Sequence, residues 1–402
     1  MSLRPESTFW RRSSAPLGTA LLLGGILLQG AVASDWPCWR VPTRDGKSSE
    51  KGIGTSVKPL WSVKVGQGYS AVTVSKGRVY TMGNDGSNDT VWCLNESNGK
   101  VVWKYSYPCT KGGDGHTGPR ASPTVDGSTV YTMSRTGIVT ALSTSGKKIW
   151  SKDVPKEVGA ALPQWHLASS PVVSGSSLIL NIGKAGVALN KKSGKVVWKT
   201  GKDASGYASA VFATSGGKKI LAMFGAKALY GVDPASGKIL WSHPWETKYD
   251  VNAADPVVSQ SNVFISSNYK SGCALLSLSS SKPSVRWQNK SICNHFNSCV
   301  LVGDCLYGND ENDLVCLALS NGAEKWREKR ALGKGGLVYA DGKLICLSDR
   351  GELFFVKASS SGYSELRRGK AVSGQVWTPP VLANGKVYCR SHEGDLACVR
   401  VK

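Results

Sequence analysis

The chain has 402 residues, a formal net charge of +22 at pH 7 and eleven cysteines. The positive balance favours anionic partners or surfaces in general, through a long-range field rather than through one site. Because the sequence has no interleaved basic and aromatic runs, nucleic acid is excluded from the expected partners.

Residues 1–33 predict a secretory signal peptide. Arginines precede an apolar run from Ala15 to Leu28, and the small residues Ala31-Val32-Ala33 follow it as a cleavage pattern. The run is shorter than the about 20 residues needed to cross a bilayer. Ser34, and not a lipid-bearing cysteine, follows the cleavage pattern. We therefore expect a periplasmic or secreted protein with no transmembrane segment after cleavage, in which residues 34–58 form an N-terminal extension.

From Pro59 onward, a tryptophan closes a short turn-and-strand phrase every 39 to 48 residues, and an eighth phrase ends at Leu366. In five phrases a glycine lies four residues before the tryptophan, as in Gly237-Lys238-Ile239-Leu240-Trp241. Periods of this length, with short strands and glycine-rich turns, are typical of propeller blades. Residues 59–402 are therefore predicted to form an all-β, eight-bladed β-propeller of four-stranded antiparallel blades. The tryptophans are Trp61, Trp103, Trp150, Trp198, Trp241, Trp287 and Trp326.

One blade is visible in the run that follows Arg120. Asp126-Gly127 separates two apolar runs, which is a strong hairpin signal. Two further strands follow, the last of them carrying Trp150. The final blade has only three strands before the chain ends, so the strand Pro59–Val65 is expected to complete it. That pairing closes the ring and removes the exposed sheet edges.

The repeated tryptophans are interpreted as packing residues between neighbouring blades. Seven similar positions cannot all face one planar ligand, but all of them can fill equivalent spaces between blades. Several cysteines lie inside apolar strand phrases, where cysteine behaves as a small buried hydrophobe, and their pairing cannot be deduced from sequence.

Lysines gather in the hairpin turns before the tryptophan strands, and these turns should lie at one end of the cylinder. Two interpretations stay open: a solvated face that keeps the protein soluble, or a surface for an anionic glycan, envelope or phospholipid. The lysines are Lys100, Lys147, Lys148, Lys191, Lys192, Lys195 and Lys238.

The crossings between blades lie at the opposite end and are long, as in Tyr105–Pro119, Asp153–Leu167 and Pro244–Ala254. Long loops on a rigid scaffold are where binding usually resides. Side chains expected around the channel mouth at this end are His116, Arg120, Trp165, His166, Tyr207, Asn252, His295, Asn297 and Trp377.

The starts of the innermost strands align into a column of mostly serines, in which Asp255 is the exception. Asp255 is therefore the leading site residue and the one candidate for catalysis. A serine before a proline also satisfies backbone groups at a strand start, so a purely structural role for the column stays open. The column is Ser70, Ser122, Ser170, Ser209, Asp255, Ser298, Gly336 and Pro379.

Other catalytic signatures are absent from the sequence. It contains no nucleophile elbow, phosphate loop, zinc-protease helix or dinucleotide fingerprint. The acidic turn Asn309–Asp313 has the composition of an ordinary hairpin turn, so no metal is expected there.

The phrase that ends at Trp241 resembles the tryptophan-docking repeat of pyrroloquinoline quinone (PQQ)-type propellers, and the opening Trp36-Pro37-Cys38-Trp39-Arg40 is similar to the start of exported PQQ-like repeat proteins. The resemblance covers nearly the whole mature chain. In length and topology it is nearest to the BamB-like members, which implies a non-enzymatic monomeric scaffold that binds protein or envelope partners through its loops.

The same superfamily contains quinoprotein dehydrogenases of alcohols and sugars, which form the alternative. Membership there implies PQQ stacked between a tryptophan and a disulfide of adjacent cysteines, with calcium held by Glu, Asn and Asp. No two cysteines are adjacent in this chain. The resemblance therefore implies that no cofactor is bound, with PQQ and calcium as the alternative.

Overall fold

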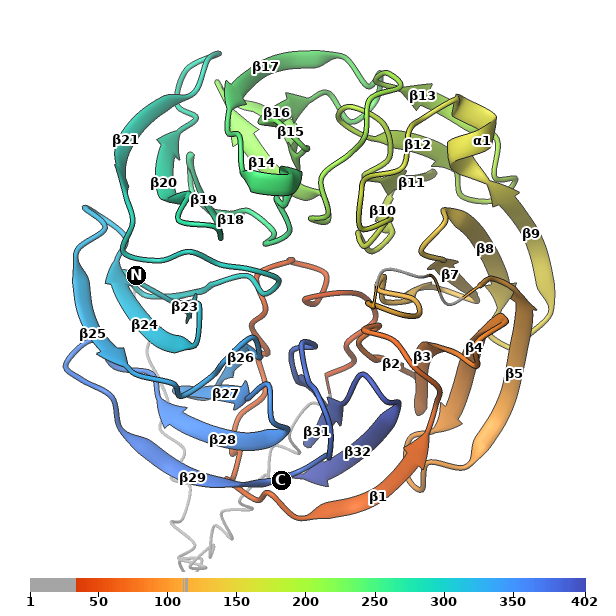
Figure 1. Cartoon of the computed structure of the whole chain (residues 1–402), viewed down its shortest axis with the longest axis vertical. Coiled ribbons are helices and arrows are strands. Elements are labelled where there is room, and N and C mark those ends of the chain that lie inside the picture. Colours follow the sequence, from red (N-terminus) through yellow and green to blue (C-terminus); the bar gives the residue numbers. More distant parts are fainter. Residues whose placement is uncertain (1–33, 111, 113–114) are drawn as a thin grey trace, which may run out of the picture. The chain divides into compact units, whose positions relative to one another are not determined.

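A computed structural model describes residues 34–110, 112 and 115–402, and the predicted signal peptide lies outside this range. In the described part, eight four-stranded antiparallel sheets are arranged as the blades of a ring (Figure 1). The eight-bladed propeller predicted from the tryptophan period is therefore confirmed.

The first four blades follow one another in chain order, each running from an innermost to an outermost strand. Blade one contains β2 (Thr73–Ser75), β3 (Arg78–Asn84), β4 (Asn88–Asn95) and β5 (Val101–Pro108). Blade two contains β6 (Thr124–Asp126), β7 (Thr129–Met133), β8 (Ile138–Ser143) and β9 (Lys148–Asp153). Blade three contains β10 (Val172–Ser174), β11 (Ser177–Leu180), β12 (Val187–Asn190) and β13 (Val196–Lys199). Blade four contains β14 (Val211–Ser215), β15 (Lys218–Phe224), β16 (Ala228–Val232) and β17 (Ile239–Pro244).

The last four blades complete the ring. Blade five contains β18 (Val257–Ser259), β19 (Asn262–Ser267), β20 (Gly272–Ser277) and β21 (Ser284–Asn289). Blade six contains β22 (Val300–Val302), β23 (Cys305–Asp310), β24 (Asp313–Ala318) and β25 (Glu324–Glu328). Blade seven contains β26 (Gly336–Ala340), β27 (Lys343–Leu347), β28 (Glu352–Lys357) and β29 (Glu365–Lys370). Blade eight contains β30 (Val381–Ala383), β31 (Lys386–Arg390), β32 (Asp395–Arg400) and the N-terminal strand β1 (Pro59–Lys64).

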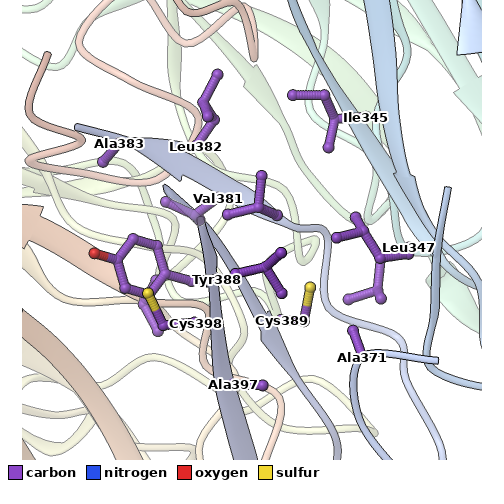
Figure 2. Packing of buried hydrophobic residues seen from close by; sticks show 14 of the residues in the cluster. Ile345, Leu347, Ala371, Val381, Leu382, Ala383, Tyr388, Cys389, Ala397 and Cys398 are labelled. Carbon is purple, nitrogen blue, oxygen red and sulfur yellow. The ribbon is translucent and has the colours of Figure 1, made fainter. Parts of the chain in front are cut away.

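The ring is closed as predicted, because β1 pairs antiparallel with β32, from Pro59 opposite Val399 to Lys64 opposite Asp395. Apolar side chains of neighbouring blades interdigitate around this closure. Figure 2 shows Ile345 and Leu347 of β27 facing the side chains of blade eight. The middle strands are buried on both faces because a blade packs on each side of them.

Each outermost strand carries a bulge, which in seven of the eight described blades lies next to the tryptophan. In blade four, Gly231 lies opposite Trp241 and Val232 lies opposite Ile239, so Leu240 is the extra residue. The bulge leaves Leu240 exposed and turns Trp241 into the molecule. Exposed apolar residues such as Ile149 and Val197 hold the same bulge position.

The bulges correct one sequence assignment. In blade seven, Val356 lies opposite Glu365 and Phe355 lies opposite Arg367. Leu366 is therefore the exposed bulge residue, and Arg367 holds the position of the tryptophan. The reason lies in blade eight, whose third strand β32 and fourth strand β1 come from opposite ends of the chain. No turn connects them, so there is no turn for an indole to contact.

The tryptophans pack between blades and donate to the next blade's turn. Trp103 Nε1 donates to the carbonyl of Thr144 at 2.9 Å, and Trp287 Nε1 donates to the carbonyl of Leu319 at 2.8 Å. Trp241 differs, because it donates to Ser215 Oγ in its own blade. The following turn in blade five contains no glycine, unlike most of the other turns.

The N-terminal extension folds into the channel, where Figure 1 shows it as the red-orange trace inside the ring. We call residues 35–54 the channel segment. Trp36 exchanges two backbone hydrogen bonds with Val74, and Tyr339 N donates to the carbonyl of Gly46. Asp35 accepts from Lys76 N in the β2–β3 turn, and Ile53 N donates to Asp341 in the β26–β27 turn, so the channel segment enters and leaves at the end that carries these turns.

Two short helices lie on the crossings at the opposite end. They are α1 (Val154–Val158), which Asp153 caps through its side chain, and the 3₁₀ helix η1 (Lys248–Asp250). Among the described residues, no helix has the length and apolar character needed to span a membrane.

Candidate functional site

A cavity of about 340 Å³ opens at the crossings end of the ring, at its centre. Its wall is built from crossing loops and from the starts of innermost strands, and its floor includes Trp39 of the channel segment. We call it the crossing pocket. Its lining includes eight of the ten predicted site residues: His116, Arg120, Trp165, Tyr207, Asp255, His295, Asn297 and Trp377.

The other two predicted residues do not line the crossing pocket. Asn252 is fully buried, and its side chain ties a crossing together by donating to the carbonyls of Gly225, Ala226 and Trp245. His166 Nδ1 is 2.8 Å from a guanidinium nitrogen of Arg135. Proximity in the sequence to Trp165 therefore did not place His166 in the pocket.

Much of the serine column is a hydrogen-bonded series of strand starts. Ser122 N donates to Ser170 Oγ, Ser170 N donates to Ser209 Oγ, and Ser209 N donates to Asp255 Oδ1, at 2.7–2.9 Å. Asp255 N continues the series to Ser298 Oγ at 2.8 Å. Each side chain therefore satisfies a backbone N–H of the preceding blade, which is the structural role left open by the sequence.

The column is shifted by one residue in the first blade. Ala71 N, and not Ser70 N, donates to Ser122 Oγ at 3.0 Å. The position equivalent to Ser122 is therefore Ala71, whose side chain has no hydroxyl. Ser70 instead accepts on its carbonyl from Arg390 and from Thr81 Oγ1.

Asp255 is engaged on both carboxylate oxygens. Oδ1 accepts from Ser209 N at 2.7 Å, and Oδ2 accepts from Trp39 Nε1 at 2.6 Å. Burial raises the pKa of the Asp255 carboxyl, while Arg40 and the two hydrogen bonds act in the opposite direction. The carboxylate thus anchors the pocket floor to the wall.

The tip of the channel segment makes that floor. Arg40 is 4% exposed and donates to the carbonyls of Ser298 and Cys299, at 3.3 and 2.7 Å. Arg44 is also buried and donates to the carbonyl of Pro171 at 3.3 Å. Positive φ angles at Arg40 and Arg44, of 57° and 61°, let the chain reverse within the channel.

Five rings form a continuous stack, and all of them except His392 line the crossing pocket. His392 stacks on Tyr69 at 4.5 Å between centroids, and Tyr69 stacks on Trp377 at 5.3 Å. Phe296 stacks on Trp377 at 4.7 Å, and His295 stacks on Phe296 at 3.8 Å. We call this series the ring stack. Because the rings cover one another, they form a rigid wall that brings together three separate crossings.

Other aromatic side chains surround the ring stack. His116 lies 5.2 Å from Trp377 and 5.5 Å from Trp165 between centroids. Tyr207 accepts from Trp165 N on its hydroxyl at 3.2 Å, and burial raises the pKa of this phenol. The pocket is therefore aromatic on most of its wall.

Two cationic side chains belong to the lining. Lys334 Nζ lies 4.8 Å from the ring centroid of Trp377 and 5.7 Å from that of Phe296. Arg120 donates to the carbonyl of His116 at 2.7 Å. Asn297 donates to the carbonyls of Lys334 and Trp377 at 3.1 Å, so it fixes both of these crossings.

His295 is buried beside the cations and is held neutral. Burial lowers the pKa of His295 from 6.5 to about 3, and the charges of Lys334 and His116 act in the same direction. Its Nε2 is 3.4 Å from the Tyr269 hydroxyl. Its Nδ1 is buried and has no hydrogen-bond partner among the described residues.

A model of the family described as outer membrane protein assembly factor BamB matches residues 109–328 of the chain, which is more than half of its length. The chain belongs to this family. No curated protein sequence matches it significantly.

Solved structures share the propeller of this BamB-family chain at low identity. BamB from Moraxella catarrhalis is 14% identical, with a TM-score of 0.65, over 86% of this chain and 100% of that one. Quinohemoprotein alcohol dehydrogenase from Comamonas testosteroni is 12% identical, with a TM-score of 0.67, over 92% of this chain and 80% of that one. A europium-containing methanol dehydrogenase is 12% identical, with a TM-score of 0.66, over 89% of both chains. At these identities the likeness is one of fold alone.

The residues of this BamB-family propeller do not fit the calcium and quinone group that the dehydrogenases imply. Asp255 is the one carboxylate in the pocket lining, and both of its oxygens already accept hydrogen bonds. No cysteine lines the pocket, and the described residues contain no group of three His, Cys, Asp or Glu side chains placed to hold a metal.

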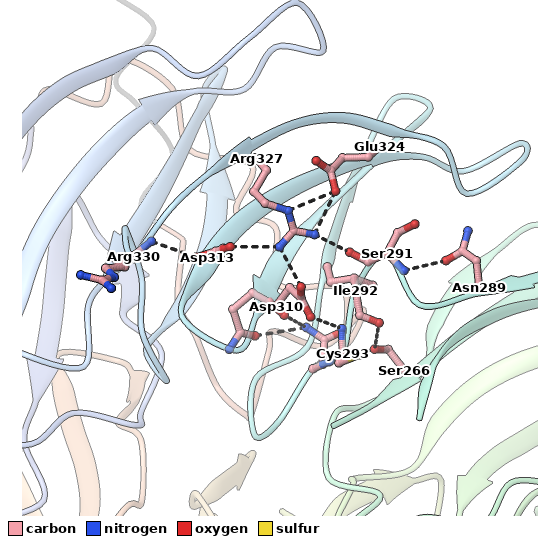
Figure 3. A network of polar contacts seen from close by, with 12 residues as sticks. Ser266, Asn289, Ser291, Ile292, Cys293, Asp310, Asp313, Glu324, Arg327 and Arg330 are labelled. Carbon is pink, nitrogen blue, oxygen red and sulfur yellow. Dashed lines mark hydrogen bonds and ion pairs between the residues drawn. The ribbon is translucent and has the colours of Figure 1, made fainter. Parts of the chain in front are cut away.

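The acidic turn after β23 is neutralised by an arginine. Figure 3 shows Arg327 between Asp310, Asp313 and Glu324, with N···O distances of 2.7, 3.1 and 2.9 Å. Arg327 also donates to the carbonyl of Ser291. These carboxylates tie blade six to the crossing before it.

Sequence reasoning missed about half of the pocket wall. Tyr69, Tyr269, Phe296 and Lys334 line it together with Trp39. Tyr69 directly precedes a column residue and Phe296 lies between two predicted site residues, so both carried a usable signal. Nothing in the local sequence places Trp39 at the far end of the channel.

Proposed function

We propose that this BamB-family chain is an exported, non-enzymatic propeller that binds a protein partner through the crossing pocket and the loops around it. The observation that carries this proposal is the aromatic wall of the pocket, in which Trp165, Tyr207 and Trp377 stand beside Arg120. Tryptophan, tyrosine and arginine are the residues that most often anchor protein interfaces, and they do so from pockets near the interface centre. An envelope polymer or an anionic surface at the lysine-bearing turns are the competing outcomes.

The partner test compares capture from a cell-envelope extract by the wild type and by Trp165→Ala. We expect the variant to lose the captured protein, since it removes a partly exposed anchor without opening the core. Leu240→Ala, which truncates an exposed apolar residue on the outer rim, is the matched control and should capture as the wild type does. Equal capture by all three proteins would overturn the assignment to the crossing pocket.

The alternative is a PQQ- and calcium-dependent dehydrogenase of alcohols or sugars. Its support is the shared propeller of the alcohol and methanol dehydrogenases. Titration of the purified chain with PQQ and calcium tests it by absorbance and calorimetry, with dye reduction in the presence of alcohols or sugars as the activity readout. We expect no calcium-dependent binding and no reduction, and saturable calcium-dependent binding with turnover would replace the proposal by the alternative.

A further inference from the structure

We infer that the crossing pocket recognises a ligand that carries one flat aromatic ring and one carboxylate group. This inference rests on the proposed function, because it names the chemistry that the pocket would accept from a ligand or partner. The ligand must carry a negative charge, which the aromatic wall alone does not require.

The first observation is the position of Lys334. Its ammonium group lies over Trp377 and Phe296, and it forms no ion pair with a carboxylate of the described residues. Other lysines of this propeller are ion-paired, as Lys227 is with Asp250 at 2.7 Å. A cation held on a ring face at the mouth of an apolar cavity attracts an anion more strongly than it would in open water.

The second observation is the state of His295. Its side chain is 7% exposed, it lines the pocket, and its Nδ1 has no hydrogen-bond partner in the described structure. A buried polar nitrogen without a partner costs free energy that a ligand atom can recover. A carboxylate oxygen can accept from this nitrogen when the neutral ring carries its proton there.

The third observation is that the one acidic side chain in the pocket lining, Asp255, is already engaged. Asp255 gives both oxygens to Ser209 and Trp39, and Arg40 lies close enough to offset its charge. The ring stack presents a rigid flat wall against which an aromatic body packs. A cavity of about 340 Å³ admits one compact ligand group and not an extended chain.

The probes are N-acetylphenylalanine and N-acetylphenylalaninamide, which have nearly the same shape and differ by one charge. Calorimetric titration of the purified chain is expected to show about tenfold tighter binding of the acid, as for other charge-assisted hydrogen bonds. Lys334→Gln should lower the affinity for the acid to that for the amide. The affinity for the amide should stay unchanged. Lys238→Gln, at an exposed turn lysine, is the matched control and should preserve the difference.

His295→Phe is the second variant, because it keeps a flat ring on Phe296 and removes the unpaired nitrogen. This variant should lower the affinity for the acid and leave the affinity for the amide unchanged. Equal affinities for acid and amide in the wild type, or no heat with either at millimolar concentration, would overturn the inference. An unchanged preference in both variants would do the same.

The source of the carboxylate is resolved by a short peptide that ends in phenylalanine. Tighter binding of the peptide acid than of the acetylated amino acid identifies the chain end of a protein partner, and exclusion of the peptide identifies a free small acid. Failure of this inference is distinct from failure of the proposed function. If Trp165→Ala abolishes partner capture while acid and amide bind alike, only the inference is lost.

Discussion

A glycine and an indole from successive blades explain most of the repeat at the scale of single residues. A Cβ added at Gly99 would lie 2.6 Å from Trp61, and one added at Gly146 would lie 2.8 Å from Trp103. The φ angles of these glycines, 71° and 89°, also favour glycine. The glycine of each of these phrases therefore lies against the tryptophan of the preceding phrase, and not against the tryptophan four residues after it.

Gly237→Ala is expected to lower the free energy of unfolding by about 2–5 kcal/mol, as the sum of a left-handed backbone cost and overpacking. Its Cβ would lie 2.6 Å from the Trp198 ring at a φ of +73°. Gly217→Ala is the matched control, because its φ is +75° and nothing lies within 4 Å of the new atom. The control should lose only about 1–2 kcal/mol. Urea unfolding measures both, and equal losses would show that the indole contact contributes nothing.

Sequence reasoning placed the pattern correctly but missed its exact register. Leu366 was aligned with the tryptophans and Ser70 with the serines, and each was wrong by one residue. A bulge adds one residue to a strand and leaves the composition of the phrase unchanged, so apolar spacing alone cannot locate it. The pairing of Phe355 with Arg367 depends on the turn that the neighbouring blade presents. The sequence around Arg367 does not contain that information.

The role of the channel segment could not be predicted from the sequence. It is short, carries several charges and forms only isolated bridges, at Trp36 and Lys47. Local propensity therefore predicts only an N-terminal extension here. Its guanidinium groups satisfy carbonyls at the starts of innermost strands, which are exposed to the channel because no further strand pairs with them. This accounts for arginines that are buried and still hydrogen-bonded.

Arg40→Met tests this element. It keeps most of the apolar stem while removing the donors to Ser298 and Cys299 and the cation near Asp255. We expect a loss of about 2–3 kcal/mol in the free energy of unfolding, as for hydrogen bonds of a charged group. Arg286→Met, at an exposed arginine on β21, should stay within about 0.5 kcal/mol of the wild type. Equal stability of the two variants would mean that the channel segment is only loosely attached.

The candidate site was predicted at the level of elements better than at the level of contacts. Crossings are long and meet at one end of the ring, so eight of the ten named residues lie in the pocket lining. The ring stack joins side chains of three crossings that are far apart in sequence. Only the closed ring brings Tyr69 against His392, and no pattern within one phrase contains that contact.

At the scale of the whole molecule, the cysteines behave as core residues. All eleven are free and buried. Burial raises the pKa of Cys93 to about 11 and that of Cys273 to about 12, so their thiolate forms are scarce at neutral pH. A propeller of this size closes its ring through strand pairing and has no need of covalent links.

Thiol counting with Ellman's reagent should therefore find almost no reactive cysteine in the native protein. After unfolding in urea without reductant, eleven thiols should react. Addition of reductant should leave the unfolding midpoint unchanged, since no cross-link constrains the unfolded chain. Recovery of fewer than eleven thiols under non-reducing conditions would reveal a disulfide and contradict the structure.

The channel segment also sets the order in which the protein can be completed. Its Glu50 accepts from Gly385 N across 335 positions, and Asp35 accepts from Asn384 across 349. These two contacts can therefore form only after the last blade exists, whereas the bridge between Trp36 and Val74 needs only blade one. Contacts of such high sequence separation are slow to form. Any nascent or truncated chain without blade eight therefore has an open ring with unpaired strand edges, and its channel segment lacks these partners.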